Sequence, residues 1–128
     1  HPVILADLVS ANKFITPETP VPAILVDPDL LVYMFDILFQ KNDNQPLIVT
    51  SEEKKGGYII LHVLMSSLRL TDEACRNLFS PSAENLMFYI CRQIARDNGE
   101  ATNKRGCGIS ASRTEDGTVI DIVLSKAK

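Results

Sequence analysis

Residues 61–79 read LHVLMSSLRLTDEACRNLF, and this stretch changes from a strand pattern to a turn and then to a helix. The apolar run at its start, which begins three residues earlier at Tyr58 and ends at Met65, has the length of a buried strand. Thr71 is a good helix N-cap, and two acidic residues follow it in what would be the first helical turn. The sequence therefore predicts a strand over the apolar run and a short helix from Thr71 to about Phe79.

A longer helix is expected upstream of this stretch, beginning after Asp27. Asp27 suits the N-cap, and Pro28 is favoured at the first helical position. Apolar side chains follow at the spacing of one helical face, and a turn-forming cluster at 42–44 ends the pattern. We expect a helix at 28–41 with a buried stripe made of Leu30, Leu31, Met34, Phe35, Ile37, Leu38 and Phe39.

The remaining elements complete one sheet with its helices. A helix at 3–13 and a strand at 23–26 are expected before the long helix. After it we expect strands at 47–50 and 58–65 around a polar loop at 51–57, a helix at 84–96 that ends at Asn98-Gly99, and strands at 107–113 and 119–124. Runs of strands with helices between them, without a βαβ repeat, predict an α+β fold. This fold is a two-layer α/β sandwich whose mixed, mostly antiparallel sheet carries its helices on one face.

Composition limits the class of protein. The chain has 128 residues, of which 45% are hydrophobic and 23% charged, and this fits one globular domain. The net charge of −3 argues against a general nucleic-acid binder, and no apolar run has the length of a membrane span. Three cysteines (Cys75, Cys91 and Cys107) lack metal-site spacing, and their odd number indicates a reducing compartment. His62 is expected to be a strand-face residue, not a ligand or a base.

Four stretches, in their order and spacing, resemble the ATP-binding domain of sensor histidine kinases, which has the Bergerat-type fold. They lie at 26–31, 61–79, 86–92 and 117–124. The resemblance implies a HATPase-like domain at 23–128, with 1–22 as a linker or helical tail from an upstream region. It also implies a two-component, bacterial and cytoplasmic setting.

The resemblance places Lys41 where active members of the family use an asparagine to hold Mg²⁺. An ammonium group only donates hydrogen bonds, whereas Mg²⁺ requires oxygen ligands. Asn42 lies one residue away, and turning the helix to use it would rotate the apolar stripe by about 100°. A second possibility is that Lys41 binds phosphate directly, without a metal.

The family's binding features for the adenine base are also replaced. Met65 stands where the family has an aspartate that accepts the adenine amino group, and Ser67 and Arg69 stand where it has glycines. Apolar groups that face no ligand need other cover. We therefore expect Met65 and Met87 to pack into a closed core or to line an open apolar groove. With a closed core, the Lys41 ammonium would lie in water at the rim.

The lid over the nucleotide is reduced to residues 80–84, and its glycines correspond to Asn85 and Met87. Only the pair Gly117-Thr118 survives from the family's pattern, and this pair also suits an ordinary strand entry. The positions of the former nucleotide cleft are thus Lys41, Asn42, Met65, Ser67, Arg69, Asn85 and Thr118.

These replacements predict a non-catalytic, pseudokinase-like domain of a larger two-component-type sensor or regulatory protein. We expect no catalytic residue, no metal and no cofactor. Its partner would be a protein or the rest of its own polypeptide, with no nucleic acid, no direct membrane contact and a possible homodimer through the upstream region. The alternatives are a divergent histidine kinase domain that still binds ATP and Mg²⁺, and an anti-sigma-like binding module.

Overall fold

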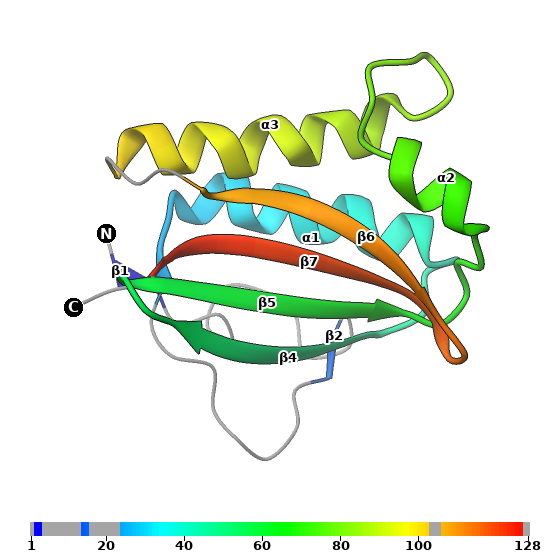
Figure 1. Cartoon of the computed structure of the whole chain (residues 1–128), viewed down its shortest axis with the longest axis horizontal. Coiled ribbons are helices and arrows are strands. Elements are labelled where there is room, and N and C mark those ends of the chain that lie inside the picture. Colours follow the sequence, from blue (N-terminus) through cyan, green and yellow to red (C-terminus); the bar gives the residue numbers. More distant parts are fainter. Residues whose placement is uncertain (1, 4–13, 16–23, 103–105, 127–128) are drawn as a thin grey trace.

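The computed structural model describes residues 2–3, 14–15, 24–102 and 106–126. It has a sheet with helices over one of its faces (Figure 1). The elements are, in chain order, β1 (Pro2–Val3), β2 (Phe14–Ile15), β3 (Ile24–Leu25), α1 (Pro28–Lys41), β4 (Leu47–Lys54), β5 (Tyr58–Met65), α2 (Asp72–Asn77), α3 (Leu86–Ala101), β6 (Gly108–Thr114) and β7 (Gly117–Lys126).

Strands β5 and β7 form the centre of the sheet and are antiparallel along their shared length. β4 is antiparallel to β5 on one side, and β6 is antiparallel to β7 on the other. β3 pairs with the far end of β7 and with β1, while β2 runs parallel to β4. The described strands therefore form a mixed, mostly antiparallel sheet, as predicted.

Burial alternates along β5 because successive side chains of a strand point to opposite faces. Its four fully buried residues face the helices, and the four between them are half-buried on the other face. β7 repeats this alternation opposite β5, so the two strands supply the floor of one core. The predicted two-layer sandwich is confirmed. The fully buried residues of β5 and β7 are Ile59, Leu61, Val63, Met65, Thr118, Ile120, Ile122 and Leu124.

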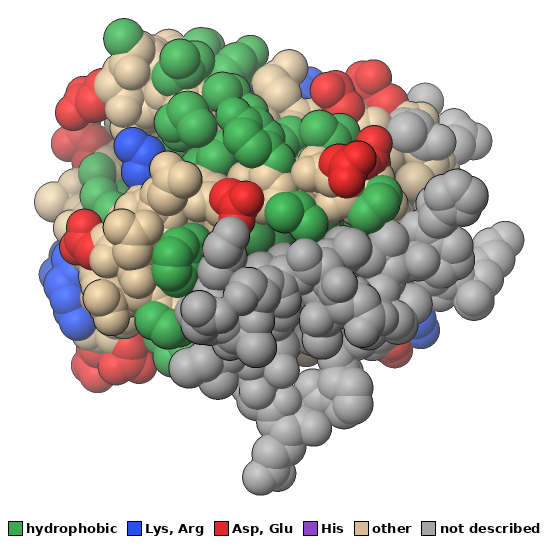
Figure 2. Space-filling model, turned by 180° about the vertical axis from the view of Figure 1, so that it is seen from behind, with side chains coloured by type: hydrophobic (Ala, Val, Ile, Leu, Met, Phe, Trp, Pro, Cys, Tyr) green, Lys and Arg blue, Asp and Glu red, His purple; other side chains and the backbone are tan. Residues whose placement is uncertain are grey.

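Helix α1 begins where its sequence predicts. The Asp27 carboxylate accepts hydrogen bonds from the backbone N–H groups of Asp29 (3.0 Å) and Leu30 (3.3 Å). Leu30 itself is 41% exposed, so its predicted place in the buried stripe is wrong. It lies on the flank of α1 together with Tyr33, about 100° around the helix from Leu31. Hydrophobic side chains are visible on this side of the molecule (Figure 2).

Two predicted boundaries are corrected. Strand β4 continues through Lys54, where a loop at 51–57 was expected, because every residue of β5 from Tyr58 to Leu64 has a partner in β4. Helix α3 does not stop at Asn98-Gly99 but continues to Ala101. Both residues of this stop signal are buried within the helix, so packing overrides their local preference.

The predicted start of a helix at residue 3 is wrong, since β1 occupies Pro2–Val3. The rest of that predicted helix, residues 4–13, lies outside the described part of the chain. The domain boundary between 1–22 and 23–128 stays a prediction, although β1 and β2 both pair with strands of the sheet. None of the described helices is long and apolar enough to cross a membrane.

Candidate functional site

The candidate site is the corner of the molecule where α1 and β5 end and β7 begins (Figure 1). The turn after β5, at residues 66–70, lies between these three element ends. The structure brings together four of the seven residues expected in the former nucleotide cleft: Asn42, Met65, Ser67 and Thr118.

Asn42 is fully buried and joins α1 to the turn after β5. Its side-chain oxygen accepts a hydrogen bond from the backbone N–H of Ser67 (2.8 Å), and its amide nitrogen donates to the carbonyl of Gln45 (3.0 Å). Asp43 and Asn44 follow with φ of 55° and 56°, a conformation that these residue types tolerate. Both polar atoms of the Asn42 side chain are thus hydrogen-bonded within the protein, which gives Asn42 a structural role.

Met65 and Thr118 are paired across β5 and β7, and both are fully buried. The Thr118 hydroxyl donates to the carbonyl of Leu68 (2.6 Å), which holds the turn against β7. Gly117 has φ of 142°, and a Cβ atom there would lie 2.5 Å from the carbonyl oxygen of Met65. Glycine is therefore required at this close approach. The predicted closed core is confirmed at Met65.

Lys41 lies at the exposed end of α1 and reaches toward α3. Its ammonium is 5.9 Å from the ring centroid of Phe88, within the range of a cation–π interaction. Phe88 is buried and meets Phe79 edge-on at 6.0 Å. The Phe88 ring, packed against Phe79, thus lies beside Lys41, and the half-buried Met87 packs against the core.

Arg69 lies in the same turn but bonds to a different element, and Asn85 lies at the start of α3. Arg69 donates from its guanidinium to the carbonyl of Glu115 (2.9 Å), linking the turn to the β6–β7 hairpin. Asn85 occupies the N-cap of α3 without a capping hydrogen bond from its side chain, and its backbone N–H donates to the hydroxyl of Ser82 (3.1 Å). Neither contact brings these residues next to Lys41.

A charged cluster that the sequence did not reveal lies on the sheet face away from the helices. His62 Nδ1 is 2.6 Å from Asp121, and its Nε2 is 3.2 Å from Glu52. Burial lowers the pKa of His62, but the hydrogen bonds to the two carboxylates raise it more, so the net shift is upward. Hydrogen bonds from Lys54 and then His62 lower the pKa of Glu52. The signal that could have found the cluster is the alignment of β5 with β7, which sets His62 opposite Asp121.

The cysteines take no part in either cluster. All three are free, and burial raises the pKa of the Cys91 thiol to about 12. Burial also raises the pKa of Cys75. Within the described ranges, no group of three or more His, Cys, Asp or Glu side chains is placed to hold a metal ion.

Solved structures share this architecture. The ATP-binding domain of PrrB from Mycobacterium tuberculosis aligns with 100% of this chain and 98% of its own, with a TM-score of 0.69 and 12% identity. The catalytic domain of the histidine kinase ThkA aligns over 87% of this chain and 76% of its own (TM-score 0.66, 22% identity). A further match is ThkA in complex with the response regulator TrrA, over 89% of this chain and 33% of that one (TM-score 0.62, 22% identity). No protein-family model and no curated protein matches the sequence. The chain therefore has the fold of histidine-kinase ATP-binding domains.

Proposed function

We propose that this chain is a non-catalytic domain of histidine-kinase type, which acts in a larger two-component signalling protein through contacts with protein. The proposal rests on the residues at the C-terminal end of α1. Lys41 stands where the resemblance expects a metal-binding asparagine, and the neighbouring Asn42 is fully buried with its side-chain oxygen bound to Ser67.

The end of α1 does not suit a magnesium ion. Mg²⁺ needs oxygen ligands, and an ammonium offers none. The Asn42 side chain is fully buried, with its oxygen on the Ser67 N–H and its amide nitrogen on the Gln45 carbonyl, so a metal ion could reach it only after the end of α1 opened. The helix would also have to turn, which would move its buried stripe away from the sheet.

The end of β5 does not suit an adenine base. Met65 replaces the expected aspartate and is 0% exposed, so its thioether belongs to the core and offers no acceptor to an exocyclic amine. Gly117 and Thr118 tie the following turn to β7 at this point. The side chains present therefore do not fit a magnesium–nucleotide group, and we derive no reaction step through one.

Protein contact is the remaining role for such a domain. The kinase ThkA, whose catalytic domain has this fold, was solved in complex with a response regulator. By analogy we propose a protein partner of this signalling class, or the rest of the same polypeptide, in the cytoplasm of a bacterium. A homodimer formed through the upstream region is compatible with this role.

Calorimetric titration with ATP and Mg²⁺ tests the proposal, with the PrrB ATP-binding domain as a positive control. We expect no heat and no thermal shift, whereas a ligand at about 100 times its Kd would stabilise the fold by ~2.7 kcal/mol. A magnesium-dependent shift would contradict the proposal and favour a divergent kinase. Binding without magnesium that is lost in Lys41→Ala would favour a metal-free phosphate site.

A further inference from the structure

Strand β6 has a free edge. In the described part of the chain it pairs only with β7, and no other backbone group bonds to it. Exposed edges are usually protected by proline, by bulges or by charged side chains. Four of the first five residues of β6 (Gly108, Ser110, Ala111 and Ser112) are small and uncharged, the strand contains no proline, and its one charged residue, Arg113, lies near its end. Such an edge can accept another strand.

A hollow of about 420 Å³ lies beside this edge, between α2, α3 and β6. Its apolar part is formed by Phe79, Ile109 and Ala111, and its polar part includes Arg76, Arg92 and Ser110. The hollow therefore combines a strand edge, an apolar floor and two cationic side chains.

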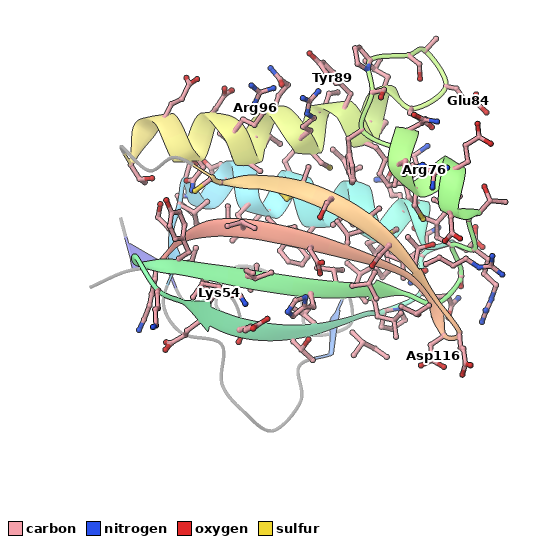
Figure 3. All side chains as sticks on the ribbon, in the orientation of Figure 1. Lys54, Arg76, Glu84, Tyr89, Arg96 and Asp116 are labelled. Carbon is pink, nitrogen blue, oxygen red and sulfur yellow. The ribbon has the colours of Figure 1, made fainter. Side chains whose placement is uncertain are left out.

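Four arginines on α2, α3 and β6 carry positive charge on this side: Arg76, Arg92, Arg96 and Arg113. Within the ranges that the structure describes, none of them has a carboxylate within salt-bridge distance. Figure 3 shows Arg76 on α2 and Arg96 on α3, the two helices that flank β6. The same helices also carry carboxylates, Asp72 and Glu73 on α2 and Asp97 and Glu100 on α3. Asp72 raises the pKa of the Cys75 thiol, whereas Arg113 lowers it. Arginines without partners are unexpected in a chain whose net charge is −3.

We infer that the free edge of β6 binds an extended, acidic segment of a partner protein, which adds to the sheet as a strand and sets its carboxylates against Arg76 and Arg92. The inference rests on the proposed role in protein contact and names the surface for it. Strand addition supplies backbone hydrogen bonds, and alternate side chains of the added strand point to one face. Here, that face offers the apolar floor and the two arginines.

Charge argues for this occupant over two others. A second copy pairing through β6 would bring the same arginines together, and like charges across an interface disfavour association. The phosphates of a nucleic acid could contact the arginines. They would not form strand-type hydrogen bonds with the backbone amides and carbonyls of the β6 edge. Nucleic-acid-binding domains are also typically basic, whereas this chain is acidic overall.

The probe for fluorescence anisotropy is a labelled seven-residue peptide as long as β6, Val-Ser-Glu-Ser-Val-Ser-Glu, which places valine and glutamate together on one face of an extended strand. We expect saturable binding that is weakened at least about tenfold in the double variant Arg76→Glu/Arg92→Glu, equivalent to about 1.4 kcal/mol. The matched control is the double variant Lys54→Glu/Lys55→Glu, which makes the same total charge change at two exposed residues next to the β4–β5 turn, and it should change affinity less than about twofold. Circular dichroism confirms that the variants fold. No binding by the wild-type chain, or an equal loss in the control, would overturn the inference.

Two further peptides, N-methylated on alternate amides, test strand addition directly. Only one set of amides can face β6, so one peptide should lose at least about tenfold in affinity and the other little. Equal behaviour of the two peptides, tighter binding of a single-stranded oligonucleotide, or a dimer in sedimentation at assay concentration would overturn the inference. ATP titration of the same samples separates a failure of the proposed function from a failure of this inference. Nucleotide binding would contradict the proposed function without changing the peptide result.

Discussion

The centre of the sandwich and the corner where α1 and β5 end are held together in different ways. At the centre, α1 places its apolar stripe on β5 and β7, and the contacts are almost all between aliphatic or aromatic side chains. At the corner, single polar contacts from Asn42 and Thr118 and the close approach of Gly117 hold a turn in place. The first arrangement tolerates a range of apolar side chains, whereas the second depends on individual atoms. A family's site can therefore be lost at the corner while the fold persists at the centre.

The largest effect is expected for Phe35→Ala at the centre. Phe35 is fully buried, and removing its ring leaves a cavity, so the free energy of unfolding should fall by about 3–5 kcal/mol in denaturant titrations. Tyr33→Ala is the control, because this aromatic side chain of the same helix is 44% exposed and should change stability by only about 0.5 kcal/mol. Similar losses in the two variants would mean that the buried face of α1 is assigned wrongly.

At the corner, Gly117→Ala should destabilise the fold through the backbone. Its φ of 142° costs a non-glycine residue about 1–3 kcal/mol, and the 2.5 Å approach to Met65 adds a clash. Gly108→Ala is the matched control, since its Cβ would meet nothing within 4 Å. Thermal unfolding of both variants decides this point, and equal melting temperatures would show that the corner can relax.

Asn42→Ala should also weaken the corner, by leaving the Ser67 N–H without its partner. We expect a loss of about 1–3 kcal/mol in the free energy of unfolding, with faster hydrogen exchange at the Ser67 amide. Gln45→Ala is a control on an exposed side chain that follows the same turn. Unchanged exchange at Ser67 would show that this hydrogen bond is not formed in solution.

The smallest effect belongs to the outer face of the sheet, where a polar cluster is held by strands and not by a turn. The folded-state pKa of His62 is raised, so its contribution to stability is full below the unfolded pKa of about 6.5 and is lost as pH rises through the folded value. We expect stability to fall by up to about 1 kcal/mol between about pH 6 and 8, because the half-buried side chain stays in contact with water, which weakens its ion pairs. In His62→Gln this decrease in stability with rising pH should disappear. An unchanged decrease would mean that other groups cause it.

Local patterns were sufficient to predict α1 and β5, and most of the face that α1 buries. A helix repeats every 3.6 residues and a strand every 2, and caps such as Asp27 and Thr71 act on their own first turn, so these signals are complete within a short window. The same reasoning predicted that Met65 would join the core, since an apolar side chain without a ligand must be covered.

The tertiary structure decided what depends on residues far apart in the chain. Asn42 meets Ser67 across 25 residues, and His62 meets Asp121 across 59, so neither contact leaves a local pattern. Strand β4 extends through Lys54 because β5 lies beside it, and α3 runs past Asn98-Gly99 because that segment is buried. Sequence periodicity specifies which face of an element is apolar. The neighbours of that element specify where it ends and which polar groups find a partner, because burial and hydrogen bonding are properties of the folded chain.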